Sequence, residues 1–167
     1  PGNQYGANGT FVYADCGVIP DPNARQLYCI AVTAAELAAK VLDITPRIAF
    51  LSYSTKGSAK TKSAQKIAEA LDLLKQQVPE LLADGELQAD AAIVPEVAKI
   101  KCPNSPIEGK ANVLIFPNLE AGNISYKLSQ RLSGCRAIGP LFLGLNKPAS
   151  DLSRGCFAQD IVDSVAV

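Results

Sequence analysis

A serine and an arginine stand side by side near the end of the chain, at Ser153 and Arg154, and an aspartate follows at Asp160. The guanidinium group of arginine is a fixed fork of hydrogen-bond donors that suits phosphate oxygens. A hydroxyl beside a carboxylate can bind and transfer a proton without histidine. The three residues therefore fit chemistry on a phosphate-bearing substrate. Their spacing alone favours a simpler interpretation, a capped C-terminal helix with an ordinary surface ion pair.

The segment from Ser54 to Lys60 is a second candidate, because it is rich in hydroxyl groups and lysines and follows an apolar run at 48–53. Backbone N–H groups at the start of a helix attract phosphate, so this loop is a candidate anion site. It lacks the GxxxxGK[ST] pattern of a nucleotide-binding P-loop. A solvated polar loop that caps the next helix fits the same residues equally well.

Two further groups of polar residues have both a chemical and a structural interpretation. Asp84 and Glu86 are spaced to hold a metal ion or share a proton, but surface carboxylates that cap the following helix show the same pattern, and we favour the latter. The segment 117–123 is as typical of a helix N-cap as of a ligand-binding loop.

The composition excludes several kinds of chemistry. The chain has 167 residues, suited to one ordinary domain, and no histidine, which rules out a Ser-His-Asp triad, a Cys-His dyad and an HExxH metal site. Its five cysteines form no CxxC pair, so we expect reduced thiols, a cytoplasmic location and no metal site. The 16 basic and 16 acidic residues argue against nucleic-acid binding, and no apolar stretch is long enough to span a membrane.

Apolar segments of two kinds alternate along the chain. Short runs predict strands at 9–14, 48–53, near 81, 112–116 and 137–145, whereas helical spacing predicts helices at 23–42, 63–77, 90–98, 121–132 and from about 157 to the end. No hairpin signal joins the strands, which indicates a largely parallel sheet covered by helices, an α/β three-layer sandwich. Ligands bind at the carboxyl ends of such strands, so the loops at 15–17, 54–58, 117–123 and 153–155 are expected at one edge.

Several blocks of the sequence together resemble the phosphate acetyltransferase (phosphotransacetylase) family. They run in the family's order from about Tyr5 to Val167: LSYSTKGS at 51–58, DGELQ at 84–88, VPEV at 94–97, ANVLIFP at 111–117, EAGN at 120–123, AIGP at 137–140, and DLSRGC at 151–156 with DIV at 160–162. Each block alone is a weak signal, but the complete set is highly specific.

The resemblance implies reversible transfer of an acetyl group between acetyl phosphate and coenzyme A, by direct attack of the CoA sulfur on the acyl carbon. Ser153 and Arg154 match the family's active-site pair, and Asp160 matches its proposed base, which we expect to be partly buried. Four further residues within the matching blocks are expected to bind substrate: Ser54, Lys56, Asn123 and Lys127. The resemblance also implies a role in acetate metabolism, a homodimer and no tightly bound cofactor, with CoA as a substrate.

The resemblance covers only the C-terminal half of a family subunit. It implies that residues 1–145 form the family's second domain, of the isocitrate/isopropylmalate dehydrogenase-like fold, and that residues 146–167 carry the catalytic loop and a helix returning to the first domain. Because the chain has no methionine and starts at Pro1, we expect an excerpt or processed product that is weak or inactive alone. Two alternatives stay open: a phosphate butyryltransferase, or a non-catalytic CoA-sensing or oligomerisation domain such as those fused to some malic enzymes.

Overall fold

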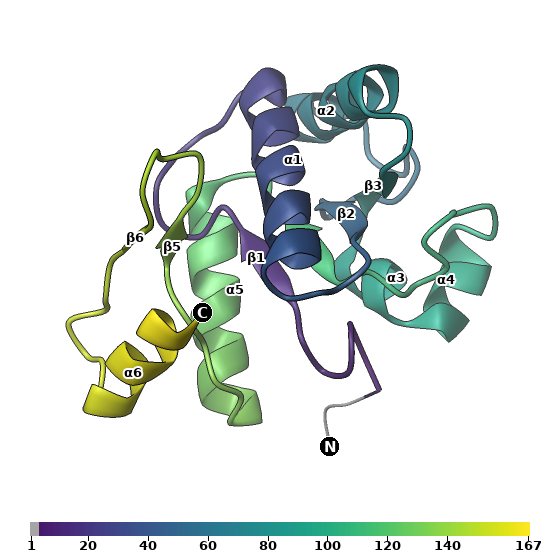
Figure 1. The fold of residues 1–167 in the computed structure, drawn as a ribbon. Coiled ribbons are helices and arrows are strands. Elements are labelled where there is room, and N and C mark those ends of the chain that lie inside the picture. Colours follow the sequence, from purple (N-terminus) through teal and green to yellow (C-terminus); the bar gives the residue numbers. More distant parts are fainter. Residues whose placement is uncertain (1–3) are drawn as a thin grey trace.

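A four-stranded parallel sheet organises the chain in the computed structural model, which describes residues 4–167 (Figure 1). The strands are β1 (Val12–Ala14), β2 (Arg47–Leu51), β3 (Leu82–Leu87) and β4 (Val113–Ile115). Their order across the sheet is β1-β4-β2-β3, and every neighbouring pair is parallel. The expected parallel sheet is therefore confirmed, with helical crossovers between its strands.

Alternation along each strand divides the apolar residues between two cores. In β2, Ile48 and Phe50 contribute to one core, while Ala49 and Leu51 contribute to the other. Successive side chains of a strand point to opposite faces, so a strand buried on both faces becomes almost continuously apolar. This is why the 48–53 run carries no polar alternation.

Helices cover both faces of the sheet and complete three layers. The helices α1 (Ala24–Lys40) and α2 (Lys62–Gln77) lie side by side over one face (Figure 1). The other face is covered by α3 (Ala89–Ile93), α4 (Pro95–Lys101) and the first turn of α5 (Leu119–Ser133). The α/β three-layer sandwich is confirmed.

Side-chain caps fix where the helices begin. Asn23 and Gln26 form a reciprocal capping box at α1, and Thr61 caps α2. Asn118 caps α5 by accepting from the N–H of Ala121 at 2.9 Å, so this helix starts two residues earlier than expected and the N-cap interpretation holds for Asn118.

The expected single helix at 90–98 is wrong, because the chain forms α3 and α4 with a break between them. Val94 separates them in extended conformation, with φ −116° and ψ 110°. Proline disfavours helical geometry in the residue before it, and Pro95 then begins α4, where its missing N–H is tolerated.

The expected buried strand at 137–145 is also wrong. Only Leu141–Phe142 forms a strand, β5, and it pairs antiparallel with β6 (Ala149–Ser150) in a separate two-stranded sheet. Gly139, Pro140 and Gly144 interrupt the run, since proline removes a donor and glycine does not pack. Figure 1 shows this hairpin and the last helix, α6 (Ala158–Ala166), beside α5 and away from the parallel sheet.

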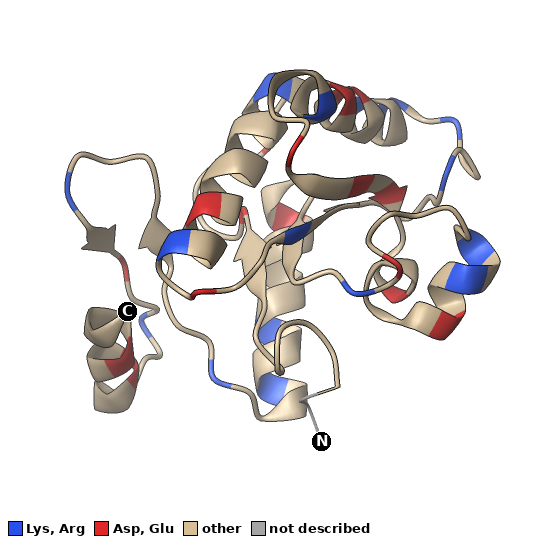
Figure 2. Cartoon of the chain, turned by 45° about the vertical axis from the view of Figure 1, so that its right-hand side comes forward, with Lys and Arg blue, Asp and Glu red and all other residues tan. Residues whose placement is uncertain are grey.

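Charged residues of both signs are interspersed over the helices and loops (Figure 2). This distribution matches the equal numbers of acidic and basic residues in the sequence. Within residues 4–167, no helix combines the length and apolar character needed to cross a membrane.

Candidate active site

The Ser153–Arg154 pair lies in a tight turn between β6 and α6. The N–H of Cys156 donates to the carbonyl of Ser153 at 3.0 Å, and the N–H of Gly155 donates to Ser153 Oγ at 3.3 Å. Both residues of the pair are exposed. Arg154 forms no ion pair with any other residue of the described chain, so its donor fork is free to meet an anion.

Asp160 follows this turn within the first turn of α6. Its Oδ2 accepts a hydrogen bond from the backbone N–H of Phe157 at 2.7 Å, which caps the helix and fixes the carboxylate. Asp160 is partly buried. The interpretation of a capped helix is thus correct in part, but the surface ion pair of this segment joins Arg136 and Asp163, at 3.3 Å.

Glu86, in β3, holds the loop that follows β2. Its Oε1 accepts hydrogen bonds from Ser54 Oγ and from the N–H of Gly57, each at 2.7 Å. Ser54 Oγ in turn accepts from the N–H of Ala59 at 2.9 Å. Both partners of this cluster, Ser54 and Glu86, are buried. The hydroxyl of Ser54 is therefore part of the loop's internal structure.

Asp84, two residues earlier in β3, pairs with Lys56. Asp84 is 1% exposed, whereas the lysine side chain is 40% exposed. Lys56 Nζ also donates to the carbonyl of Gly85 at 3.0 Å. The favoured interpretation of Asp84 and Glu86 as surface carboxylates capping the next helix is wrong, because both are buried and bind the preceding loop. No third potential metal ligand of residues 4–167 joins them.

The backbone N–H groups of this loop are already occupied. Each of the five from residue 55 to residue 59 donates to the loop itself or to Glu86: Thr55 to Ser58 Oγ, Lys56 to Glu86 O, Gly57 to Glu86 Oε1, Ser58 to Thr55 O and Ala59 to Ser54 Oγ. A phosphate cradle needs free N–H groups. The backbone of residues 55–59 consequently does not supply the expected anion site, and the exposed lysines Lys56 and Lys60 are the cationic donors of the loop.

The helix α5 carries the other two residues expected to bind substrate. Asn123 Nδ2 donates to the carbonyl of Cys16 at 3.1 Å, which ties the helix to the turn after β1. Lys127 is exposed, and its ammonium lies 4.9 Å from the centroid of the Tyr126 ring. Burial, with a smaller contribution from the charge of Asp15, raises the pKa of the Cys16 thiol to about 12, which disfavours its thiolate form.

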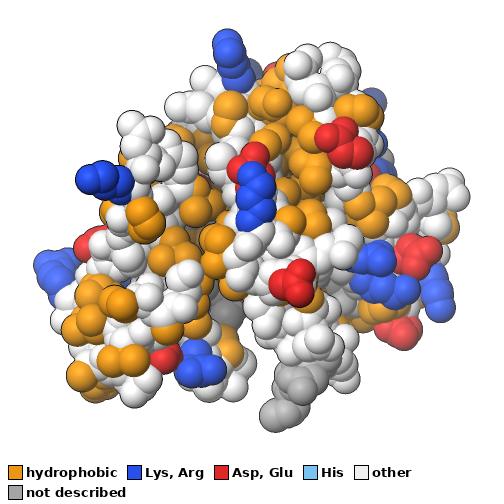
Figure 3. All heavy atoms as spheres, in the orientation of Figure 1, with side chains coloured by type: hydrophobic (Ala, Val, Ile, Leu, Met, Phe, Trp, Pro, Cys, Tyr) orange, Lys and Arg blue, Asp and Glu red, His pale blue; other side chains and the backbone are white. Residues whose placement is uncertain are grey.

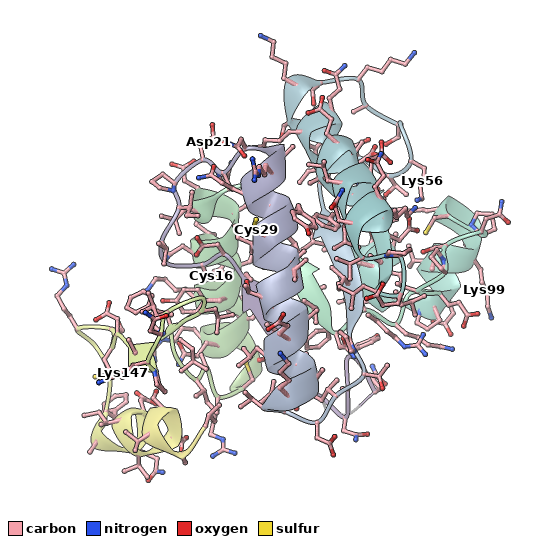
Figure 4. All side chains as sticks on the ribbon, turned by 45° about the horizontal axis from the view of Figure 1, so that its top comes forward. Cys16, Asp21, Cys29, Lys56, Lys99 and Lys147 are labelled. Atoms are coloured by element: carbon pink, nitrogen blue, oxygen red, sulfur yellow. The ribbon has the colours of Figure 1, made fainter. Side chains whose placement is uncertain are left out.

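The structure brings only some of these residues together. Ser153 and Arg154 lie in one turn and Asp160 lies in the first helical turn after it. The hairpin–α6 unit that carries them lies beside α5, which holds Asn123 and Lys127 (Figure 1). The loop with Ser54 and Lys56 is elsewhere: Figure 4 places Lys56 on the opposite side of the molecule from Lys147 of the hairpin.

Comparisons with known proteins agree with the fold and the motif blocks. A family model described as phosphate acetyl/butaryl transferase matches residues 4–167. The chain belongs to this family. Two relatives named phosphate acetyltransferase are 54% identical, in Acetivibrio thermocellus, and 52% identical, in Thermoanaerobacterium thermosaccharolyticum. The first alignment covers 100% of this chain and 50% of the relative, and the second covers 99% and 51%. The chain thus spans about half the length of the curated relatives it matches.

Solved structures of the family share the fold. A phosphotransacetylase from Streptococcus pyogenes superimposes with a TM-score of 0.87 and 52% identity, over 93% of this chain and 47% of that protein. A branched-chain phosphotransacylase from Enterococcus faecalis gives a TM-score of 0.76 at 26% identity, over 91% and 54%. Family membership thus rests on sequence and on architecture independently.

Proposed function

We propose that the protein containing this chain is a phosphate acetyltransferase, which moves an acetyl group reversibly between acetyl phosphate and coenzyme A. The observation that carries the proposal is the turn in which a free arginine and a serine precede a fixed carboxylate, Asp160. The names of relatives that are about half identical to the chain support it.

The proposed reaction is a direct displacement at the acyl carbon. Asp160 takes the proton of the CoA thiol, because the thiolate is the effective nucleophile and a free thiol has a pKa near 8.5. The sulfur forms a bond to the carbonyl carbon, and the bond from that carbon to the phosphate oxygen breaks. Phosphate leaves with the electron pair, and acetyl-CoA is the other product.

Ser153 and Arg154 would stabilise the charges that develop in this step. The hydroxyl of Ser153 donates to the sulfur or to the carbonyl oxygen as negative charge builds up there. The guanidinium of Arg154 binds the departing phosphate, which needs charge stabilisation more than a proton. The exposure of both residues leaves them accessible to a substrate.

The four proposed substrate-binding residues differ in how accessible they are to a substrate. Lys127 is exposed, and Lys56 uses two of its three N–H donors within the protein, on Asp84 and Gly85, which leaves one for a substrate oxygen. Ser54 is fully buried, and Asn123 binds the Cys16 carbonyl. These two would act indirectly, by shaping the loop and by positioning α5.

Acetyl rather than longer acyl groups is favoured by the relatives. Those named phosphate acetyltransferase are up to 54% identical to the chain, whereas the branched-chain phosphotransacylase is 26% identical. A non-catalytic CoA-sensing domain is the less favoured alternative, because it would not need a free arginine beside the serine and Asp160.

Several broader properties belong to the same proposal. We infer that residues 1–145 form one domain and that residues 146–167 return to a further domain of a longer subunit. We also propose a cytoplasmic homodimer in acetate metabolism, with no tightly bound cofactor. The odd number of cysteines and the lack of any CxxC pair are typical of reduced thiols in such a compartment.

The test is acetyl-CoA formation from acetyl phosphate and CoA, measured side by side for the 167-residue chain and for the complete gene product that carries it. We expect turnover in the complete product and little or none in the chain alone. Equal activity of both would contradict the need for a further domain. CoA binding without any turnover in either would favour the sensing alternative.

A further inference from the structure

A cavity of about 470 Å³ lies between α4 and the segment 103–110 that follows it. Its volume is within the range of pockets that bind small molecules. The lining residues are Pro95, Ala98, Lys99, Cys102, Pro103, Ser105, Glu108 and Lys110. None of them is among the proposed active-site residues. Figure 4 places Lys99 far from Lys147 of the C-terminal hairpin and on the same side of the molecule as Lys56.

A glycine holds the wall of this cavity in place. Gly109 is buried, has φ +68°, and lies so close to α4 that a Cβ there would be 2.7 Å from the backbone nitrogen of Pro95. Two backbone hydrogen bonds tie the segment down: the N–H of Ser105 to the carbonyl of Cys102 at 2.9 Å, and the N–H of Ala111 to the carbonyl of Ala92 at 3.0 Å. The cavity is thus a defined part of the fold.

The rim of the cavity is basic. Lys110 pairs with Glu108 at 3.0 Å, whereas Lys99 forms no ion pair with the described residues. The hydrogen bond from Lys110 lowers the pKa of Glu108, and the charges of Arg47 and Lys99 lower it further. Figure 3 shows acidic side chains beside the basic ones on this side of the molecule. The charged residues of the lining are Lys99, Lys110 and Glu108, which give it a net charge of +1.

The inner wall contains an unsatisfied hydroxyl. Ser105 is 6% exposed, and its Oγ has no hydrogen-bond partner among the described residues. Buried hydroxyl groups are normally paired, because an unpaired one loses its hydrogen bonds to water without compensation. The buried Cys102 beside it is a weak partner: contact with Ser105 partly offsets the rise in pKa that burial gives this thiol, but no hydrogen bond of normal length joins the two side chains. A ligand in the cavity can therefore supply the hydrogen-bond partner that Ser105 lacks.

We propose that this cavity binds a small oxyanion, inorganic phosphate or a short carboxylate, through the ammonium groups of Lys99 and Lys110 and the hydroxyl of Ser105. All three groups are donors, so the ligand must supply acceptor oxygens. A negative charge on the ligand complements the positive charges of the two lysines. The apolar surfaces of Pro95 and Ala98 accommodate the methyl group of a carboxylate. This inference does not depend on the proposed acetyltransferase activity.

The test is a titration of the chain, labelled with ¹⁵N at its glycines, with inorganic phosphate and separately with acetate. The amide of Gly109 reports on the cavity, while that of Gly155 reports on the Ser153 turn, so binding at the two places is distinguished. We expect a saturable shift of Gly109. A shift with phosphate only, or with acetate only, identifies which oxyanion the site takes. No saturable shift of Gly109 with either anion overturns the proposal.

Two variants separate a binding role of Ser105 from a structural one. Ser105→Ala should weaken binding about tenfold, the usual scale for a hydrogen bond to a charged group, and should leave the Tm unchanged or slightly higher because it removes an unpaired hydroxyl. Lys99→Gln should also weaken binding, whereas Lys147→Gln, on the distant hairpin, should not. Unaltered affinity in Ser105→Ala and Lys99→Gln, or a clear fall in the Tm of Ser105→Ala, would overturn the site as assigned.

Discussion

At the scale of single residues, the pair of Lys56 and Asp84 contributes to the stability of the loop after β2. Asp84 is buried, and Lys56 is its one cationic partner within residues 4–167. Lys56→Met leaves that carboxylate without a cationic partner, which should lower the free energy of unfolding by about 3 kcal/mol. This value is at the lower end of the range for breaking a buried ion pair, because the lysine is partly exposed. Urea unfolding measures the loss.

The matched variants distinguish this pairing from a general effect of losing a lysine. Lys60→Met removes an exposed lysine of the same loop and should have almost no effect. The double variant Lys56→Met with Asp84→Leu should recover most of the stability, because no buried charge then remains unpaired. A double variant less stable than Lys56→Met alone would contradict the argument.

The thiol of Cys16 gives a prediction about pH. Burial raises its pKa to about 12 in the folded protein, whereas its unfolded value is close to 9. Between pH 9 and 12 the thiol is deprotonated in the unfolded state and still protonated in the folded state. The unfolded state is therefore favoured more as the pH rises, and this thiol lowers the free energy of unfolding from about pH 9 toward 12. Cys16→Ala should therefore flatten the alkaline loss of stability.

The same thiol should resist alkylation at pH 8.5, where the exposed Cys29 and Cys135 react with iodoacetamide. Mass spectrometry of the folded protein locates the modified cysteines. Modification of Cys16 as fast as that of Cys29 would show that its thiol is neither buried nor raised in pKa.

At the scale of elements, Gly122 controls how closely α5 approaches β1. A Cβ at this position would lie 2.2 Å from the carbonyl oxygen of Asp15. Gly122→Ala should therefore push the helix away and destabilise the protein by about 1–3 kcal/mol, the usual effect of overpacking. Thermal unfolding measures this, and Gly17→Ala is the control, since its Cβ would make an ordinary 3.6 Å contact. Equal melting temperatures for the two variants would contradict the close approach.

The elements that the sequence predicts well are those determined locally. Helical spacing and an N-cap asparagine define α1, and a short apolar run ended by Pro117 defines β4. The break between α3 and α4 and the small β5–β6 hairpin were missed, because a proline or glycine within an apolar run changes its structure without removing its hydrophobicity.

The local structure of the candidate site was predictable to a different degree in each of its parts. The Ser153–Arg154 turn and Asp160 lie within eight residues, so the motif itself places them on one short segment. The burial of Asp84 and Glu86 was not predictable, because it depends on Lys56 and Ser54 from a separate strand–loop unit. The sequence did carry a signal for this burial: two carboxylates in alternate positions of an apolar strand, together with a lysine after the neighbouring strand.

At the scale of the whole molecule, the C-terminal unit stands apart from the parallel sheet. Three apolar side chains are exposed there at intervals of four residues: Phe157, just before α6, at 70%, and Ile161 and Val165, within α6, at 44% and 83%. Such a stripe on a helix normally packs against another surface. The unit that carries the catalytic candidates is therefore the part of the chain with most apolar surface left to bury.

The central claim is that this C-terminal turn performs acetyl transfer. The most direct measurement is the steady-state rate of acetyl-CoA formation by the complete gene product carrying Ser153→Ala, Arg154→Ala or Asp160→Asn, with Lys147→Gln as the control. We predict that each of the three lowers kcat about 100-fold or more, the usual scale for losing a proton acceptor or a charge-stabilising donor, and that the control keeps its rate. Near-normal kcat in all three folded variants would contradict the account.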